Sequence, residues 1–290
     1  MRLFFTIICL LFSQISAYSK INTVLITPKR PIVPSLSEQL FIYYYLGEGR
    51  TPFFVPNVAP NGTIQQLIAA YPQYLARADG NTLLWKDGTR MPFDDGKTPS
   101  NYLQLLDNAD LADQLKTPYH TGSPSGVPAQ NEDPGRVRNE LFFKKMYGNS
   151  SKEVAKNLTD VDWFGTKLKV TKINGVDEKL RAIAAELATK PALKKYLVKP
   201  GGTFKWRIIA QTKRLSMHSF GIAIDINTGF SNYWQWAGKG KKVKEGSAGI
   251  VYKNKIPIEI VEIFEKYHFI WGGKWYHYDT MHFEYRPELF

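Results

Sequence analysis

The feature that most limits the fold is a short alternating segment at positions 221–226. Three isoleucines, Ile222, Ile224 and Ile226, alternate with Ala223 and Asp225. Because successive side chains of a strand point to opposite faces, this pattern predicts a strand with one apolar face and one face that carries a carboxylate. A carboxylate on such a strand is costly unless it is paired or binds a metal ion. We therefore expect Asp225 to have a partner.

A histidine precedes this strand and is a candidate for that partner. His218 stands three residues before Gly221, and a turn at this glycine would bring the imidazole back over Asp225. Histidine nitrogen and aspartate oxygen are both ligands that zinc accepts in proteins. The segment therefore predicts two metal ligands.

A second strand is predicted at 281–285, where His282 and Glu284 share one face. Asp279 lies at the mouth of this strand, placed to reach a water bound by the same metal as His282. Three protein ligands with one open position are the arrangement of a catalytic zinc site rather than a structural one. The metal lowers the pKa of its water, and a nearby carboxylate takes the proton. Asp279 is therefore the expected general base.

Elsewhere the sequence mixes helical and strand patterns without a regular strand–helix–strand repeat. This texture predicts an α+β fold with a small antiparallel sheet and flanking helices. An Asp-Gly pair at 87–88 predicts a hairpin turn. Helices are expected at 40–46, 63–75, 139–147, 176–187 and 256–267, and strands at 83–85, 91–93, 168–173, 204–210, 221–226, 269–271 and 281–285.

The same texture predicts three regions. Residues 18–150 are irregular and rich in prolines and turn signals, and they form an expected N-terminal accessory region. Residues 151–290 are more regular and contain both motifs, so they form the expected catalytic domain. Residues 1–17 are typical of a signal peptide.

That signal begins with Arg2, continues in an apolar run at 3–12 and ends in small residues at Ala17. The alternative is an uncleaved anchor, but the apolar run is too short to span a bilayer comfortably. No later segment is long and apolar enough to cross a membrane. We therefore expect an exported protein of the periplasm or cell envelope, with no stable membrane span after cleavage.

The charge and the cysteine count narrow the function classes. Cys9, the only cysteine, lies inside the signal, which excludes disulfides, cysteine catalysis and cysteine metal ligands from the mature chain. The formal net charge of +12 suggests an anionic partner. Export disfavours nucleic acid, so acidic polymers of the cell wall are the expected partner; alternatively, the lysines only keep the protein in solution. A monomer is expected.

Together the two motifs resemble the zinc D-Ala-D-Ala carboxypeptidase family, which includes vancomycin-resistance D,D-peptidases and L-alanyl-D-glutamate phage endolysins. The stretch 272–285 is most similar to the endolysin branch, whose base is Asp rather than Glu. The resemblance covers 161–290 and implies the fold of hedgehog domains and D,D-peptidases. The residues that match the first family motif are Ser216, His218, Gly221, Ala223 and Asp225.

The resemblance implies a role for each matching residue. His218, Asp225 and His282 would hold one zinc ion, and Asp279 would activate the water and later protonate the leaving amine. Arg207 would stabilise the oxyanion or clamp a substrate carboxylate. The expected substrate contacts are Ser216, Gln211, Trp275, Tyr278 and Glu284. Glu284 could equally form a structural ion pair.

Other positions leave alternatives open. Gln211 departs from the small residue expected beside Arg207. His277 either flanks the site or is structural, and the aromatic residues at 271–278 either wall a groove or belong to the core. The segment 133–139 also resembles exported relatives, although less specifically.

The resulting hypothesis is a metallopeptidase that hydrolyses an amide of the peptidoglycan stem peptide. The bond is either D-Ala-D-Ala, as in a carboxypeptidase, or L-Ala-D-Glu, as in an endopeptidase. The alternatives are a catalytically inactive wall-binding module that retains zinc and a zinc-containing signalling domain of the hedgehog type. A binding module would lack a ligand or the base, and none is missing here. The intact Asp279 and the bacterial-looking signal argue against the signalling domain.

Overall fold

The computed structural model describes residues 62–238 and 243–290. All of them belong to one compact unit, Ala59–Phe290. The predicted signal peptide at 1–17 and the predicted helix at 40–46 lie outside the described residues. Within the described part of the chain, no helix is long and apolar enough to cross a membrane.

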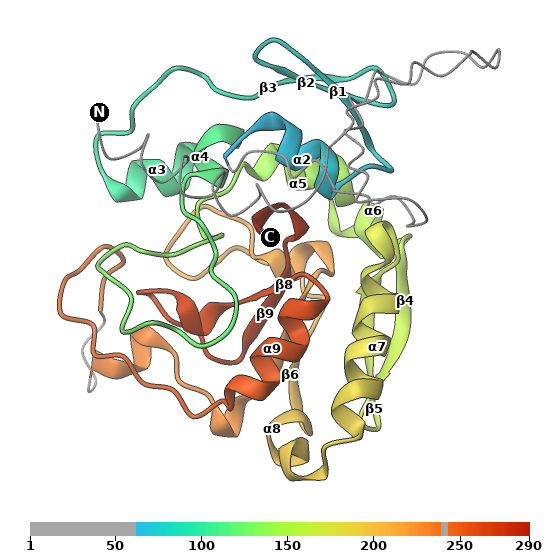
Figure 1. Cartoon of the computed structure of the whole chain (residues 1–290), viewed down its shortest axis with the longest axis vertical. Helices are drawn as coiled ribbons and strands as arrows, with labels where there is room; N and C mark the ends of the chain where they lie inside the picture. Colours follow the sequence, from blue (N-terminus) through green and yellow to red (C-terminus); the bar gives the residue numbers. More distant parts are fainter. Residues whose placement is uncertain (1–61, 239–242) are drawn as a thin grey trace, which may run out of the picture. The chain divides into compact units, whose positions relative to one another are not determined.

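The fold is a mixture of helices and three small antiparallel sheets, as the sequence predicts (Figure 1). The sheets have the strand orders β1-β2-β3, β4-β5 and β6-β7-β9-β8. The helices are α2 (Ile64–Ala70), α3 (Tyr102–Asn108), α4 (Leu111–Leu115), α5 (Glu140–Tyr147), α6 (Ser151–Ala155), α7 (Val176–Ala188), α8 (Lys194–Leu197) and α9 (Ile258–Lys266). The strands are β1 (Leu75–Asp79), β2 (Thr82–Trp85), β3 (Arg90–Pro92), β4 (Leu158–Trp163), β5 (Thr166–Thr171), β6 (Pro200–Gly202), β7 (Ala223–Asn227), β8 (Phe269–Trp271) and β9 (His282–Tyr285).

The register of the four-stranded sheet brings the two sequence motifs together. In the antiparallel pair of β7 and β9, Asp225 lies opposite His282 and Ala223 lies opposite Glu284. Residues directly opposite each other in a ladder share a face of the sheet. The three isoleucines at 222, 224 and 226 are almost completely buried, as the alternation predicts. One face of this sheet therefore belongs to the core and the other carries the polar side chains.

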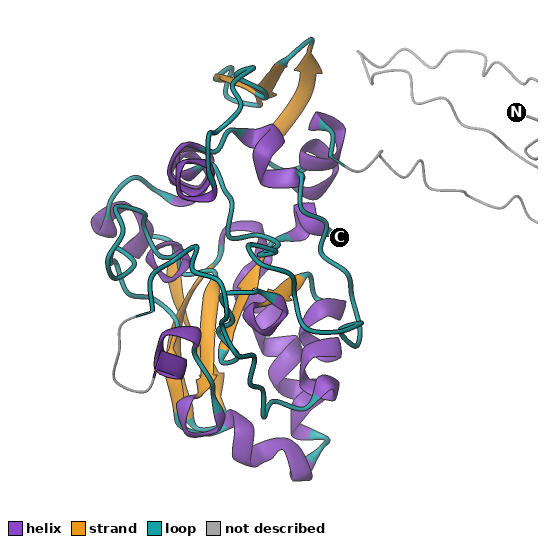
Figure 2. Cartoon of the chain, turned by 90° about the vertical axis from the view of Figure 1, so that its left-hand side faces the viewer, coloured by secondary structure: helices purple, strands orange, loops and turns teal. Residues whose placement is uncertain are grey.

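Helix α9 covers the core side of this sheet. Its apolar stripe buries Ile260 and Phe264, and the ring of Phe264 stacks on Phe283 of β9 with 4.0 Å between centroids. The helix starts directly after Pro257, whose fixed φ suits a helix start. Figure 2 shows helices along one side of the strands and mostly loops and short helical turns along the other.

The residues before 150 pack on the same core as those after it. Tyr71 of α2 contacts Phe142 of α5, and Phe143 of α5 contacts Phe220 beside β7, with centroids 5.4 and 6.0 Å apart. All these residues belong to one hydrophobic cluster. The boundary near residue 150 therefore does not separate two hydrophobic cores, and the division into an accessory and a catalytic part remains a prediction about function.

Three predicted elements differ from the structure. Among the described residues, the segment 204–210 forms one isolated bridge, from Ile208 to Leu215, because its backbone hydrogen-bonds to residues 214, 216 and 218, in the loop before the 3₁₀ turn at 217–220 and in the turn itself, instead of a strand. The strand predicted at 168–173 ends at Thr171, since Asn174 takes a left-handed φ of 60° in a 3₁₀ turn. The helix predicted at 63–75 ends at Ala70, five residues before β1 begins.

Candidate functional site

The position of His218 depends on a tight turn. The residue lies in a 3₁₀ helix, Met217–Phe220, that ends at Gly221 with a φ of 68°. A Cβ at Gly221 would lie 2.7 Å from Leu158 Cδ2 and 3.2 Å from the backbone nitrogen of Thr171. Both the positive φ and the lack of space require glycine. The turn places the imidazole of His218 over Asp225, as the sequence predicts.

Three potential ligand atoms converge at this point. His218 Nε2 lies 3.2 Å from Asp225 Oδ1, His282 Nδ1 lies 3.0 Å from the same oxygen, and the two nitrogens are 3.2 Å apart. A tetrahedral zinc ion with bonds of about 2.0–2.1 Å would separate its ligands by about 3.3 Å. The spacing therefore fits one small tetrahedral metal ion.

The far nitrogen of each imidazole is held by an acceptor. His218 Nδ1 donates to the carbonyl oxygen of Thr203 at 2.5 Å, and His282 Nε2 donates to Glu284 Oε2 at 2.9 Å. In the neutral imidazoles the near nitrogens then carry lone pairs. Two nitrogen lone pairs and a carboxylate oxygen thus face one another, an arrangement that requires a cation among them.

The electrostatics of the cluster agree with this requirement. Burial would raise the pKa of Asp225, but His218 and His282 outweigh burial and hold this pKa far below its usual range. Burial would lower the pKa of His282, but the carboxylates of Asp225 and Glu284 raise it to about 10. The cluster therefore attracts a positive charge, which a metal ion or a proton can supply.

A chain of buried charges supports His282 from behind. Glu284 Oε1 accepts from Arg286 Nη1 at 2.9 Å, and Arg286 Nε donates to Glu288 Oε1 at 2.6 Å. We call Glu284, Arg286 and Glu288 the carboxylate–arginine chain; all three are at most 1% exposed. Its far end is held by Tyr71 and Gln114, which donate to Glu288 at 2.6 and 3.0 Å. Residues before 150 thus support the orientation of His282 indirectly, through the carboxylate–arginine chain.

Asp279 lies beside the cluster with one oxygen free of hydrogen bonds. Its Oδ1 is buried and has no partner among the described residues. Its backbone nitrogen donates to Gly272 at 2.9 Å, and its carbonyl accepts from the His282 nitrogen at 3.1 Å. Burial, and then the charge of Asp225, raise the pKa of Asp279 to about 7. A buried carboxylate oxygen without a donor fits a position next to a metal-bound water.

A cavity of about 300 Å³ opens onto the cluster. Its walls combine arginines, aromatic rings and the candidate ligands. The lining residues are Arg136, Arg138, Arg207, Ile209, Ala210, Ser216, Met217, His218, Asp225, Tyr233, Trp234, Gln235, Trp236, Trp275, His277, Asp279, Met281, His282 and Glu284.

Four of the further predicted site residues line this cavity and two do not. Arg207, Ser216, Trp275 and Glu284 are among its walls. The positive charge of Arg207 also acts on Asp279, where it partly opposes the rise of the pKa caused by burial and Asp225. Gln211, by contrast, is exposed in a turn with a φ of 65°.

Tyr278 also lies outside the cavity wall. Its hydroxyl donates to the carbonyl of Val251 at 3.0 Å, and its ring contacts Tyr252. The structure thus places Tyr278 in the packing of the 250–253 segment.

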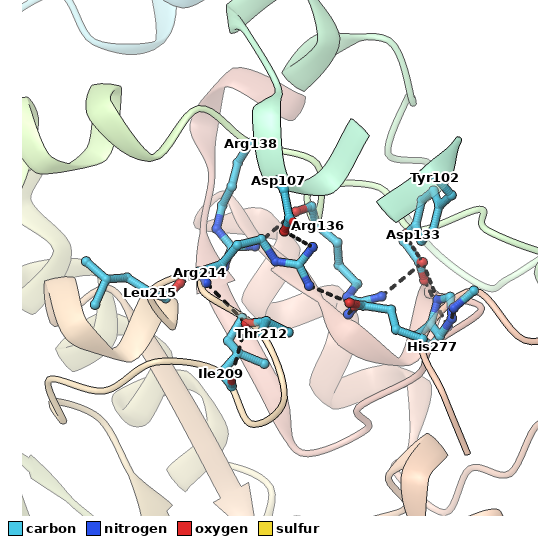
Figure 3. Close-up of polar contacts among 12 residues, drawn as sticks. Tyr102, Asp107, Asp133, Arg136, Arg138, Ile209, Thr212, Arg214, Leu215 and His277 are labelled. Carbon is cyan, nitrogen blue, oxygen red and sulfur yellow. Dashed lines mark hydrogen bonds and ion pairs between the residues drawn. The ribbon is translucent and has the colours of Figure 1, made fainter. Parts of the chain in front are cut away.

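His277 is held between segments that are distant in sequence (Figure 3). Its Nδ1 donates to Asp133 at 2.6 Å, and its Nε2 accepts from the backbone nitrogen of Gly246 at 3.0 Å. Asp133 also accepts from Tyr102 and from Arg136. Since both ring nitrogens have partners, His277 positions the wall of the cavity rather than offering a metal ligand.

Sequence reasoning did not single out Arg136 and Arg138. Both lie in the 133–139 segment, whose resemblance to exported relatives was the only signal. They reach the cavity because the loop before α5 crosses to the catalytic side, where Trp275 Nε1 donates to Pro134 at 2.7 Å.

Two histidines and an aspartate that converge beside a buried carboxylate define a candidate hydrolytic metal centre. Residues 210–285 match the model of a family described as D-alanyl-D-alanine carboxypeptidase. The match supports the resemblance to D-Ala-D-Ala carboxypeptidases that the sequence predicts, and it supports a peptidase that acts on D-Ala-D-Ala peptidoglycan. The match spans about a quarter of the chain. Neither the curated proteins nor the solved structures gave a match.

Proposed function

We propose that this protein is an exported zinc metallopeptidase that hydrolyses an amide bond of the peptidoglycan stem peptide. The observation that carries the proposal is the convergence of His218 Nε2, Asp225 Oδ1 and His282 Nδ1 within 3.2 Å of one another. The family match of residues 210–285 supports the peptidase class and, by family, the choice of zinc.

A zinc ion held by these three side chains would polarise the scissile carbonyl and lower the pKa of a water molecule. The protein supplies the remaining chemistry. Asp279 takes a proton from the attacking water at its free oxygen and returns it to the leaving amine as the C–N bond breaks. Arg207, on the cavity wall, stabilises the negative charge that develops on the carbonyl oxygen.

Two substrate bonds fit this chemistry. The aspartate base favours the L-Ala-D-Glu bond, as in the endolysin branch, and the family description favours D-Ala-D-Ala. In either case the fold is that of hedgehog domains and D,D-peptidases, with residues 151–290 as the catalytic part and 18–150 as an accessory part. The protein acts as a monomer in the periplasm or cell envelope.

The test is incubation of the purified protein with peptidoglycan fragments, with and without a chelator, followed by mass analysis of the products. We expect a product that a chelator abolishes and added zinc restores. The product masses identify the bond. If no chelator-sensitive product forms while the protein still sediments with peptidoglycan, the enzyme proposal is rejected and the protein is a wall-binding module.

A further inference from the structure

Arg138, on the wall of the cavity, has no role in the proposed reaction. Arg138 lies just before α5, outside the region that matches the family. Its Nη1 donates to the carbonyl of Arg136 at 3.0 Å, and its Nη2 donates to the carbonyl of Leu215 at 2.9 Å (Figure 3). Leu215 directly precedes Ser216, another residue of the cavity wall. Two carbonyls thus hold the guanidinium in the wall of the cavity that opens onto the candidate ligands.

The charge of Arg138 lacks a direct carboxylate partner. Its neighbours Arg136, Arg214 and Arg286 each form ion pairs, whereas Arg138 forms none among the residues that the structure describes. A guanidinium has five N–H donors, and within the described ranges 62–238 and 243–290 two of those of Arg138 have acceptors. Burial lowers the pKa of Arg138 to about 10, so it stays charged at neutral pH. A partly buried cation with free donors is suited to bind an anion.

The two candidate substrates share an anion at the corresponding place. In D-Ala-D-Ala the leaving residue carries the free C-terminal carboxylate. In L-Ala-D-Glu the peptide continues through the γ-carboxyl, so the α-carboxylate of D-Glu is free beside the scissile amide. Both leaving residues therefore have a carboxylate on the carbon that bears the leaving nitrogen.

We infer that Arg138 binds the α-carboxylate of the residue on the leaving side of the scissile amide. This inference rests on the proposed function, and it leaves Arg207 for the developing charge on the carbonyl oxygen. A planar fork with free N–H groups can bind both oxygens of one carboxylate. Arg138 then selects substrates by the charge at this carbon rather than by the side chain.

The inference is tested with two pairs of short peptides, one pair ending in D-Ala-D-Ala and one containing L-Ala-γ-D-Glu. Within each pair, one member has the free α-carboxylate and the other has a carboxamide there. Binding to the zinc-loaded Asp279→Asn variant is measured by calorimetry, because this variant lacks the general base and hydrolyses the peptides too slowly to disturb the measurement. The ratio of kcat/KM for acid and amide is measured in the otherwise unchanged enzyme.

We expect the acid to bind about tenfold to a hundredfold more tightly than the amide in at least one pair, as for a charge-assisted hydrogen bond. The pair that shows this preference identifies the substrate. Arg138→Gln should abolish the preference, and Arg138→Lys, which keeps the charge without the fork, should retain part of it.

The matched control is Arg214→Gln. Arg214 is a buried arginine that pairs with Glu245 at 2.6 Å and does not line the cavity. The Arg214→Gln variant should leave the ratio of kcat/KM for acid and amide peptides unchanged even if it destabilises the fold.

An equal loss of acid and amide binding in Arg138→Gln would overturn the inference, because it would mean that Arg138 only offsets the nearby charge of Glu284. Acid-selective binding without hydrolysis would keep the inference and reject the proposed function.

Discussion

The carboxylate–arginine chain behind His282 makes a quantitative prediction about Glu284. Each of its oxygens accepts from a different donor: Oε2 from His282 Nε2 at 2.9 Å and Oε1 from Arg286 Nη1 at 2.9 Å. A glutamine in this place has one acceptor and one donor. Glu284→Gln must therefore turn its amide NH₂ toward one of the two partners.

Either orientation is unfavourable. If the NH₂ faces His282, the imidazole proton must move to Nδ1, the nitrogen that the metal requires. If it faces Arg286, a buried guanidinium loses a carboxylate. We expect zinc affinity to fall about tenfold to a hundredfold, the usual effect of removing a partner behind a metal ligand. We also expect the free energy of unfolding to fall by about 3 kcal/mol, as for a broken buried ion pair.

Two measurements separate these effects. Zinc affinity is measured by competition with a chromophoric chelator, and the stability of the metal-free protein is measured by urea unfolding. The control is Ile183→Ala in α7. Ile183 is completely buried, so its truncation should lower the free energy of unfolding by about 2–5 kcal/mol without altering the carboxylate–arginine chain. If Glu284→Gln weakens zinc binding no more than Ile183→Ala does, the argument that Glu284 orients His282 is refuted.

Three further predictions follow from single residues. Asp279→Asn should lower kcat by about 10²–10⁴ while the zinc content, measured by atomic absorption, is unchanged; loss of the metal instead would make Asp279 a ligand. Burial would raise the pKa of Asp133, but Arg136 and His277 lower it to about 2, below the unfolded value of about 3.9. Asp133 therefore adds about 3 kcal/mol of stability above pH 4 that is lost as the pH falls toward 2. The acid unfolding of Asp133→Asn should lack this component. Gly221→Ala should lower the free energy of unfolding by at least about 1 kcal/mol because of its φ of 68°, and it should weaken zinc binding. A melting temperature equal to that of the wild type would contradict this prediction.

The alternation of side chains along two short strands predicted which polar side chains share a face, and the assignment of His218, Asp225 and His282 as ligands also rested on the resemblance to the family. A strand has a period of two residues, so Asp225 must share a face with Ala223, and His282 with Glu284. The residue types then limited the chemistry, since imidazole and carboxylate groups on one face need a partner or a cation. The helices at 139–147, 176–187 and 256–267 were likewise predictable within two residues, because each has its own apolar stripe and a start signal: a capping asparagine, an Asn-Gly turn and a proline, respectively.

The segment 204–210 shows where this local reasoning fails. Its alternation of Phe204 and Trp206 with exposed residues is typical of a strand, and both rings do contact the core. Its backbone, however, bonds to residues 214, 216 and 218, which form a loop and a 3₁₀ turn and not a strand. A pattern of side chains reports which face is buried and does not identify the partner of the backbone.

The sequence by itself therefore determined which side chains share a face within each of the two strands, and that their chemistry calls for a partner or a cation. The pairing of β7 with β9, which sets Asp225 opposite His282, came from the tertiary structure. Only the tertiary structure decided what surrounds them. Asp133 and His277 are 144 positions apart, and Arg286 and Gly135 are 151 apart. Contacts of this kind have no local period, because they arise where the loop before α5 packs across the catalytic sheet, and that packing depends on the shape of the whole core.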